Sequence, residues 1–459
     1  MPVSEKLYQF WAKKPRKTMH PAKLIALVFG AIILLGAGLL TLPAASRSGV
    51  SCNFLSALFT ATSATCVTGL SLFDTYTQWS GFGQVVILVL IQLGGLGFMS
   101  IASLLLFMLG RRVGLKERMV IAQSLSVSDL DAVVRLQKTV LVGSFAIEAV
   151  GAVVLMFRFM PAFGFPQALK WGVFHSVSAF CNAGFDIFGV LEPGSSLAVF
   201  QSDPVVLMTI SALIVIGGLG FLVWQEMIQG RRWKAYGVYT KLVIIATVAL
   251  LVTGMAAFLA LEWNNPQTLG AMSVGDKLLN GFFQSVTTRT AGFASFDQAA
   301  LSDGGKAVTI VLMLVGGCSG STAGGVKTVT VMVLLLFLWS RLRGRSTVTV
   351  FKRTIPAGQV LDAMTLTGIM VLLAVFGAVF ISATSPIGFT DGLYESVSAL
   401  ATVGLTAGAT GKLSLASQML IILYMYFGRV GVLTLSMGFL VGDRAAERIR
   451  YAQTNLLIG

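Results

Sequence analysis

Long apolar segments alternate with shorter segments of mixed polarity along the whole chain. The apolar segments predict eight helices, at residues 22–42, 81–110, 139–161, 204–228, 239–262, 307–340, 358–383 and 414–441. An apolar run of 18 or more residues is long enough to cross a bilayer as a helix. The pattern therefore predicts an all-α integral membrane protein, because a soluble protein would need far more polar surface.

The predicted helices fall into four pairs. In each pair, a first (outgoing) helix and a second (returning) helix enclose a medium-length segment of intermediate polarity. This order gives four tandem helix–pore-loop–helix repeats, at residues 21–112, 135–232, 238–343 and 357–443. Internal repeats decide the architecture before local detail does. We therefore expect residues 21–459 to form a single pore domain that follows a short cytoplasmic segment, residues 1–20.

The middle segments of the four repeats align with one another. They read FTATSATCVTGL (59–70), FHSVSAFCNAGF (174–185), FQSVTTRTAGF (283–293) and YESVSALATVGL (394–405). Each is too short to span a bilayer and is more typical of a re-entrant segment. Irregular backbone at membrane depth is tolerated only where it is buried in protein or lines a watery cavity. A pseudo-fourfold arrangement of these segments around a central pore satisfies both conditions.

Composition and charge placement agree with this prediction. The chain of 459 residues is 55% hydrophobic and 11% charged, with a net charge of +14. Its basic residues cluster before residue 24 and at 111–138, 231–241, 341–353 and 444–450, which are alternate gaps between the apolar segments. Basic loops mark the cytoplasmic side, so both termini and three loops are expected there. This placement argues for contact with membrane lipid and against nucleic acid as a partner.

The residues that most enzymes need are scarce. The 4 cysteines lie far apart and there are only 2 histidines, so neither a disulfide framework nor a histidine-based metal cluster or catalytic triad is indicated. The first 20 residues contain no apolar run and are not a secretory signal. We expect no enzymatic activity and no bound cofactor.

A glycine ends each middle segment and suggests an ion filter. Glycine adopts positive φ without steric cost, which lets successive carbonyls point toward one axis. Rings of backbone carbonyls replace the hydration shell of potassium. The predicted ion-binding residues, with potassium as their metal ion, are Cys66, Val67, Thr68, Gly69, Cys181, Asn182, Ala183, Gly184, Thr290, Ala291, Gly292, Thr402, Val403 and Gly404.

The motifs TCVTGL, FCNAGF, TTRTAGF and TVGLTAG resemble those of the Trk/Ktr/HKT superfamily of potassium transporters. The Ktr membrane subunits are the most similar type, because the first apolar segment already starts near residue 22. Two departures from potassium channels predict a less regular filter. Each repeat has one glycine instead of a full TVGYG, and the third repeat is one residue shorter between Ser285 and Gly292.

This resemblance implies potassium uptake across the cytoplasmic (inner) membrane of a bacterium. It also implies a homodimer of the membrane subunit and a cytosolic, nucleotide-binding, KtrA-like ring subunit as regulator. Sodium is a candidate activator, and the sequence leaves sodium dependence open. The alternative mechanism is a secondary active cation transporter with a midplane binding site. Such transporters often have inverted repeats, whereas all four repeats here have the same orientation.

A glycine-rich segment, GSTAGGVKT at 320–328, interrupts the returning helix of the third repeat. It is close to a nucleotide-phosphate loop, but Val326 displaces Lys327 from the required spacing and no strand precedes it. Each glycine disfavours a helix by about 1 kcal/mol relative to alanine, so a break below the filter is expected. The resemblance implies a loop that partly closes the pore. The predicted gate residues are Gly316, Gly317, Cys318, Ser319, Gly320, Ser321, Thr322, Ala323, Gly324, Gly325 and Arg429.

Arg429 replaces the second glycine of a pair that the first two repeats keep as Gly94-Gly95 and Gly217-Gly218. An arginine at bilayer depth costs about 2.5–3.5 kcal/mol on insertion scales. We expect it to face the cavity, to bind carbonyls or hydroxyls of residues 316–325, and to repel potassium; a purely structural role is the alternative. The glycine pairs are expected to allow close helix packing.

Other charged residues lie near the predicted filter. Arg289 is expected to be a structural anchor at the outer or back side of the filter. Asp74, Asp186 and Asp297 follow their filter glycines by a few residues. They could form an external vestibule that attracts cations, or they could simply be solvated acids in loops.

Overall fold

The computed structural model describes residues 21–97, 130–230 and 232–431, and it is mostly helical. All four outgoing helices are confirmed, as α2 (Pro21–Leu40), α8 (Leu130–Phe163), α12 (Val238–Glu262) and α16 (Ala357–Thr384). Within the described residues, these four helices contain the stretches that are long and apolar enough to cross a membrane by themselves. A fifth span results if the bent pair α10 (Pro204–Gly218) and α11 (Phe221–Ile228) counts as one.

The outer faces of the long helices carry large apolar side chains. Leu35 on α2 is 70% exposed, Val150 on α8 is 65% exposed and Leu372 on α16 is 72% exposed. Such exposure would promote aggregation in water, whereas lipid tails are as apolar as these side chains. The exposed faces are therefore suited to contact with lipid.

A short helix leads into each middle segment and packs against the outgoing helix of its own repeat. These helices are α3 (Phe54–Thr65), α9 (Phe165–Phe180), α13 (Val274–Thr287) and α17 (Phe389–Leu400). All four end a few residues before the glycine of the segment. The chain then turns back, so each short helix directs its C-terminal carbonyl end toward the glycine segment.

The returning helices also share a way of starting. They are α5 (Gly81–Leu96), α10, α14 (Asp303–Leu314) and α18 (Leu415–Val430). A side-chain oxygen caps the N-terminus of each one, and the caps are Ser80, Asp203, Ser302 and Ser414. Such caps satisfy a free backbone N–H and fix the first turn.

The break expected in the third returning helix is present, because α14 ends at Leu314 and α15 (Thr328–Leu342) starts 14 residues later. The expectation of a continuous helix over 204–228 is wrong, because α10 and α11 meet at 99°. Gly220 lies at this bend with φ +92°, a conformation that side-chain-bearing residues rarely adopt. Gly97 and Gly431 directly follow α5 and α18 with φ of +80° and +90°. The rest of the predicted 81–110 and 414–441 helices lies outside the described residues.

Gly94 and Gly217, the first glycines of the two pairs, pack closely as expected, and Gly428 does the same in the fourth repeat. A methyl group on any of them would collide with a carbonyl oxygen at the end of the short helix in the same repeat. The pairs are Gly94 with Thr65, Gly217 with Phe180, and Gly428 with Leu400. Each returning helix is therefore locked against the residue that leads into the glycine segment.

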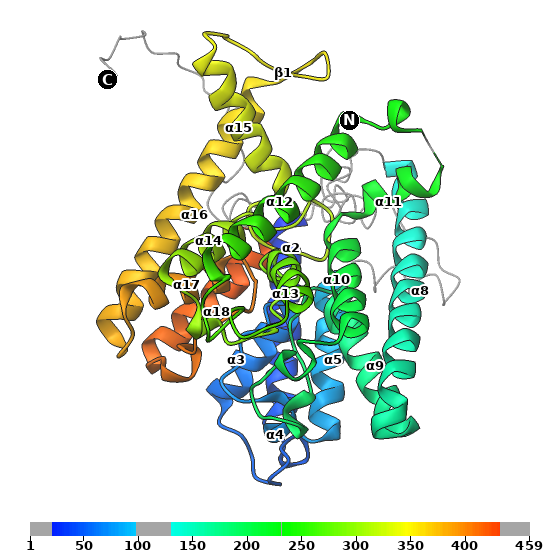
Figure 1. Ribbon diagram of the computed structural model, residues 1–459, viewed down its shortest axis with the longest axis vertical. Helices are drawn as coiled ribbons and strands as arrows, with labels where there is room; N and C mark the ends of the chain where they lie inside the picture. The colour runs from blue at the N-terminus through cyan, green and yellow to red at the C-terminus, as the bar shows by residue number, and fades with distance from the viewer. Residues whose placement is uncertain (1–20, 98–129, 231, 432–459) are drawn as a thin grey trace, which may run out of the picture.

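A short hairpin corrects the all-α expectation. Strands β1 (Val348–Val350) and β2 (Arg353–Ile355) pair antiparallel. Phe351 and Lys352 join them with φ of +47° and +63°, as a two-residue hairpin turn requires. The hairpin and α15 project at one end of the molecule, and α4 (Thr75–Gln78) lies at the opposite end (Figure 1).

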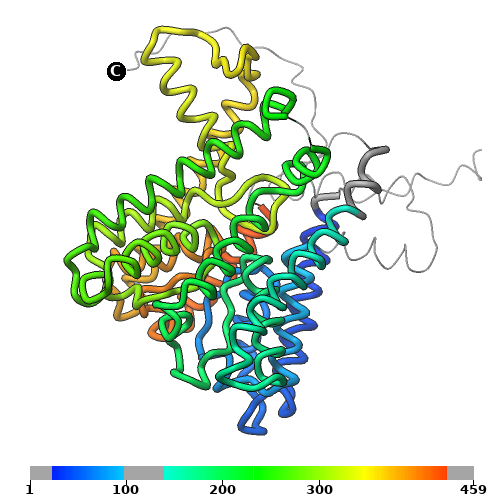
Figure 2. The backbone as a smooth tube through the Cα atoms, turned by 45° about the vertical axis from the view of Figure 1, so that its right-hand side comes forward, coloured from blue at the N-terminus to red at the C-terminus, as the bar shows by residue number. Residues whose placement is uncertain are grey.

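Short 3-10 helices complete the loops of the fold, at η1 (Pro43–Ala45), η2 (Phe188–Val190), η3 (Ala198–Phe200), η4 (Trp233–Ala235), η5 (Gln298–Ala300) and η6 (Thr410–Lys412). The two largest hydrophobic clusters are contributed mainly by different halves of the chain, one by α3, α5, α9 and α10 and the other by α16, α17 and α18. These halves lie side by side (Figure 2). The glycine segments lie where the two clusters meet.

Candidate functional site

The four glycine segments contact one another in a closed order. The glycine of each repeat lies against the carbonyl oxygen of the residue that precedes the glycine in the next repeat. The contacts are Gly69 with Ala183, Gly184 with Ala291, Gly292 with Val403, and Gly404 with Thr68. A methyl group on any of these glycines would lie 2.7 Å or less from that oxygen. The order runs from the first repeat to the fourth and back to the first, so the segments surround one axis.

The backbone alternates its conformation in the same way in each segment. The glycine has positive φ, and so does the residue two positions before it, with the residue between them in a conventional conformation. The non-glycine members are Val67, Asn182, Thr290 and Thr402, at φ +49°, +57°, +66° and +51°. Positive φ is unfavourable for β-branched residues, and such strain clusters at functional sites. Alternation of this kind turns successive carbonyls toward the same side.

A hydroxyl in each short helix holds the glycine segment of the same repeat. These residues are not among the predicted site residues, although a serine or threonine stands at the same place in all four aligned segments. In the first and fourth repeats the hydroxyl accepts a hydrogen bond from the glycine N–H. In the second and third repeats the hydroxyl donates to the carbonyl of the residue that follows the glycine. The bonds are Ser63 with Gly69 (3.0 Å), Ser178 with Phe185 (2.7 Å), Thr287 with Phe293 (2.6 Å) and Ser398 with Gly404 (3.1 Å).

The third repeat accommodates its one-residue deletion in the turn before the glycine segment. The N–H of Ala291 bonds to the carbonyl of Thr287, four residues back. In the first repeat, the N–H of Thr68 bonds to the carbonyl of Ser63, five residues back. The tighter turn brings Thr290 and Gly292 into the same backbone conformations as their counterparts. The irregularity expected for the filter is thus confined to the turn that leads into it.

Two residues of the predicted filter, Cys66 and Cys181, are the C-caps of α3 and α9. Both are buried. The Cys181 sulfur lies 3.8 Å from Glu148 and 3.9 Å from Gln92. These two side chains belong to α8 and α5, so the Cys181 thiol lies against the surrounding helices.

The glycine-rich loop between α14 and α15 is bound to the bend between α10 and α11. The Cys318 N–H donates to the Gly218 carbonyl at 3.0 Å, and the Phe221 N–H donates to the Gly320 carbonyl at 2.8 Å. The Tyr239 hydroxyl donates to the Ser319 carbonyl at 2.9 Å. The loop is therefore held by the second repeat and by the first helix of the third.

The same loop also contacts the glycine segments of other repeats. The Thr322 hydroxyl donates to the carbonyl of Phe180, the last residue of α9, at 3.1 Å. A methyl group on Gly324 would collide with the Thr402 side chain. The Lys327 ammonium donates to the carbonyl of Ala323 at 2.7 Å. The lysine of the phosphate-loop-like motif is thus directed at its own loop.

Arg429 bridges the loop and the first repeat. Its guanidinium donates to the Thr322 carbonyl, which is a partner of the kind expected from the sequence. It also donates to the carbonyl of Gly94 and, at 3.1 Å, to that of Gly95. Among the described residues no carboxylate forms a salt bridge with this guanidinium, so its positive charge stays beside the loop.

Arg289 lies next to the start of α15. Its guanidinium donates to the Thr328 hydroxyl at 3.2 Å, and this hydroxyl donates to the Gly316 carbonyl at 2.8 Å. The Arg289 side chain therefore lies on the side of the glycine segment that faces the glycine-rich loop. Of the two expected places, the outer side and the back side, the outer side is wrong.

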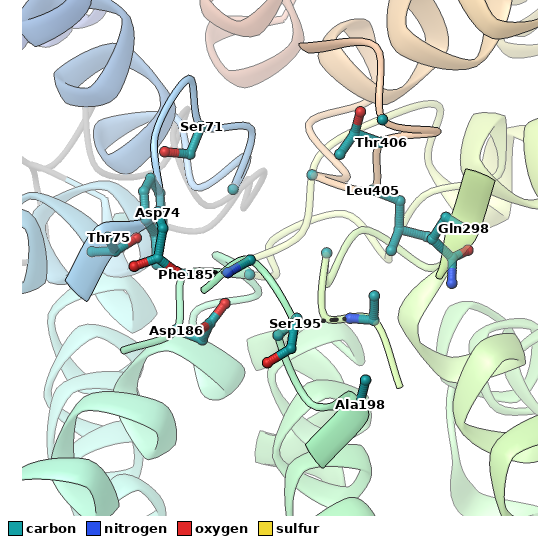
Figure 3. A pocket seen from close by; sticks show the side chains of 18 of the residues that line it. Ser71, Asp74, Thr75, Phe185, Asp186, Ser195, Ala198, Gln298, Leu405 and Thr406 are labelled. Atoms are coloured by element: carbon teal, nitrogen blue, oxygen red, sulfur yellow. Dashed lines mark hydrogen bonds between the residues drawn. The ribbon is translucent and has the colours of Figure 1, made fainter. Parts of the chain in front are cut away.

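The side of the ring that faces α4 opens into a pocket of about 520 Å³, which is lined by the glycines of all four segments. Its acidic residues are Asp74, Asp186, Glu192 and Asp297, and no basic residue of the described chain lines it. Asp74 and Asp186 lie on one side of the pocket, across from Gln298 and Thr406 (Figure 3). Burial and the neighbouring Asp74 carboxylate raise the pKa of Asp186 to about 7. Asp74 and Asp297 also cap short helices, so their carboxylates are held in place.

Comparisons with known proteins agree on one family. The model of the TrkH family, described as a cation transport protein, matches residues 3–445. The potassium/sodium uptake protein NtpJ of Enterococcus hirae is 40% identical over 97% of this chain and 99% of its own length. The Ktr system potassium uptake protein B of Bacillus subtilis is 37% identical over 96% and 97%. The crystal structure of the potassium transporter TrkH from Vibrio parahaemolyticus has the same fold, with a TM-score of 0.72, 18% identity, and coverage of 93% of this chain and 86% of that one.

Proposed function

Because the chain belongs to the TrkH family of cation transport proteins, we propose that it carries potassium into a bacterial cell across the cytoplasmic membrane. Its relatives from Enterococcus hirae and Bacillus subtilis bear the names of potassium uptake proteins. The family is one of transporters and not of enzymes. The observation that carries the proposal is the closed order of contacts among the four filter glycines and the carbonyls beside them.

The proposed filter is a ring of backbone carbonyls at the centre of four pore-loop repeats. The carbonyls of Thr68, Ala183, Ala291 and Val403 come together at the four glycines. Each carbonyl dipole replaces part of the hydration shell of a potassium ion. The hydroxyls of the short helices and the close contact of each glycine with the carbonyl of the next repeat hold the ring at one diameter. A fixed diameter favours potassium over the smaller sodium ion.

The proposed gate is the loop of residues 316–325 together with Arg429. The loop touches Phe180 and Thr402, which directly precede or belong to the filter segments. The positive charge of Arg429, which forms no salt bridge within the described residues, adds an electrostatic barrier, because like charges repel strongly where little water screens them. Opening requires the loop to release its bonds to Arg429 and to the bend between α10 and α11.

Partners belong to the same proposal. The relatives of the Ktr system are named as components of a system, which supports a separate regulatory subunit. We infer a homodimer regulated by a cytosolic nucleotide-binding ring, with sodium as a candidate activator. Potassium is the substrate, and no resident cofactor is part of the mechanism.

The test is ion flux in proteoliposomes that contain only the purified protein. Rubidium uptake should be saturable, should be inhibited by potassium more strongly than by sodium, and should follow an imposed voltage. A pore predicts flux in either direction as the voltage is reversed. Strict coupling to a second ion would instead favour a secondary active transporter, and absence of rubidium uptake under all these conditions would refute the proposal.

The gate has its own test. Deleting residues 317–324 should raise rubidium flux and weaken its regulation, because the obstruction and the partner of Arg429 are both removed. If flux falls to background while the protein remains folded and in the membrane, the loop is not a gate.

A further inference from the structure

The residue that follows the first aromatic residue of each aligned segment is polar in all four repeats. The four residues are Thr60, His175, Gln284 and Glu395. All of them are buried, with at most 1% of the residue exposed. A polar side chain in such a place costs free energy unless it is hydrogen-bonded. Their partners therefore indicate what this position does.

In the second and third repeats the partner lies in the chain that leaves the filter glycine. The Ile187 N–H donates to His175 Nε2 at 3.2 Å, while His175 Nδ1 lies 2.7 Å from the Trp171 carbonyl within the same helix. The amides of Gln284 and Gln298 bond to each other in both directions, at 2.6 and 3.1 Å. Each short helix thus holds the outer side of the filter segment from behind.

In the fourth repeat, the Glu395 carboxylate also binds the chain that leaves the filter glycine. Its oxygens accept from the hydroxyls of Thr406 and Thr410, the latter at 3.0 Å. No salt bridge involves Glu395 in the described part of the chain. A buried carboxylate without an ion pair is costly, so its hydrogen bonds to this segment are the interactions that compensate for its burial. Thr60 differs, because its hydroxyl donates to the Ser56 carbonyl in its own helix.

The third and fourth repeats are joined through these side chains. The Tyr394 hydroxyl donates to Gln298 Oε1 at 3.2 Å, and Tyr394 directly precedes Glu395. Gln298 and Thr406 both line the pocket outside the filter glycines (Figure 3). One buried network therefore connects two of the short helices to the rim of the pocket.

We propose that Glu395, with His175 and Gln284 as its counterparts, is a positioning residue that sets the potassium-over-sodium preference by fixing the chain just outside the filter glycines. This inference rests on the proposed carbonyl filter. Selectivity depends on the positions of a few carbonyl dipoles, and a site loses function when its support lets it move by about 0.5 Å. Glu395 makes the largest contribution because a carboxylate can accept from both threonines at once.

The test compares Glu395→Leu and Glu395→Gln with a matched carboxylate elsewhere. Glu262 is also fully buried and also binds a threonine hydroxyl, that of Thr268 at 2.8 Å. Neither residue lines the pocket, so Glu262→Gln is the control. For each purified variant we would measure the KM for rubidium, inhibition by sodium, the maximal rate, and hydrogen–deuterium exchange of residues 405–412.

Glu395→Leu should reduce the potassium-over-sodium preference by about tenfold, in line with lost hydrogen bonds to a charged group, and Glu395→Gln by less because one acceptor remains. The maximal rate should persist, and residues 405–412 should exchange faster. Glu262→Gln should change neither selectivity nor this exchange. If Glu395→Leu does not fold, Glu395→Gln and Thr410→Val decide the question.

Unchanged selectivity and unchanged exchange in the Glu395 variants would overturn this inference alone. The same would follow if Glu262→Gln altered selectivity equally. Absence of potassium selectivity in the unmodified protein would instead overturn the proposed filter, while the exchange measurement would still report whether Glu395 holds its segment.

Discussion

The four glycines of the proposed filter leave no room for a side chain. Serine at position 69, 184, 292 or 404 would have to adopt positive φ and would also meet a carbonyl oxygen of the next repeat. Backbone strain of this kind costs about 1–3 kcal/mol. Each 1.4 kcal/mol of lost ion binding raises a dissociation constant about tenfold.

Each of these Gly→Ser variants should therefore raise the apparent KM for rubidium by about tenfold and lower the preference over sodium. Gly404→Ser should have the largest effect, because its contact with the Thr68 carbonyl is the closest of the four, and Gly184→Ser the smallest. Gly164→Ser is the matched control, because Gly164 also has positive φ, +76°, with nothing within 4 Å. Wild-type KM and selectivity in two or more filter variants would refute the carbonyl ring.

Asp186 makes the outer pocket sensitive to pH. Burial and the carboxylate of Asp74 raise the pKa of Asp186 to about 7, so a proton binds to it as the pH falls from 8 to 6. The bound proton removes one negative charge from a pocket that also contains Glu192 and Asp297. Cations are then attracted less strongly.

The apparent KM for rubidium should rise by about threefold between pH 8 and pH 6, as expected for weaker electrostatic attraction. Asp186→Asn should remove this dependence and should keep the high KM at both pH values. Asp303→Asn is the control, because Asp303 lies outside the pocket. A KM that is independent of pH in the unmodified protein would show that the charge of Asp186 does not act on the entering ion.

At the scale of elements, Arg429 holds three of them together. It lies in the last turn of α18 and donates to the loop at Thr322 and to the end of α5 at Gly94. Its charge should raise the barrier for a cation that leaves the proposed filter. Arg429 is not part of that filter, so the affinity for the ion should stay the same. The maximal rate is therefore the parameter that should respond.

Arg429→Ala should raise the maximal rate of rubidium uptake about fivefold, the effect of lowering a barrier by ~1 kcal/mol, with little change in KM. Arg429→Lys separates charge from geometry, because lysine keeps the charge but lacks the planar fork of donors. A rate that stays low in the alanine variant would assign Arg429 a structural role.

The bend between α10 and α11 is a second element that bears on the loop. Gly220 has φ +92°, and a methyl group on it would lie 2.9 Å from the Ser319 carbonyl oxygen. The bend and the loop therefore have to move together. Their backbone hydrogen bonds explain why the second returning helix is interrupted although its sequence is mostly apolar.

At the scale of the whole molecule, the two ends differ in charge and in role. The acidic pocket opens on the side of α4, and the β1–β2 hairpin projects at the opposite end (Figure 1). Lys352 and Arg353 at the hairpin tip are exposed. Under the proposed function this end faces the cytoplasm, where basic loops collect, and it is the end available to a regulatory subunit.

Reversing both charges, with Lys352→Glu and Arg353→Glu, should weaken binding of the regulatory ring by about tenfold, because like charges at an interface oppose association. Basal rubidium flux without the ring should not change. Lys412→Glu, in η6, is the control. Unaltered binding of the ring by the doubly reversed variant would place the docking surface elsewhere.

Sequence alone determined the helices and the repeated glycines. An apolar stretch of bilayer length has to form a helix, because every backbone group in lipid has to be hydrogen-bonded within the segment. The outgoing helices α2, α8, α12 and α16 were predictable to within a few residues for this reason, except that α8 begins earlier. The glycines of the four middle segments were visible because each recurs at the same place in its repeat.

Only the tertiary structure decided what those residues contact. Arg429 and Gly94 are 335 residues apart, and no periodicity links them. The bend at Gly220 depends on hydrogen bonds to a loop of the next repeat, whereas glycines in an apolar stretch are equally compatible with a packed helix. His175, Gln284 and Glu395 differ in chemistry, and their common position becomes meaningful only when the chain beyond each glycine folds back onto them. Local sequence fixes a backbone conformation, but the partner of a buried polar group is set by which distant segments packing brings within reach.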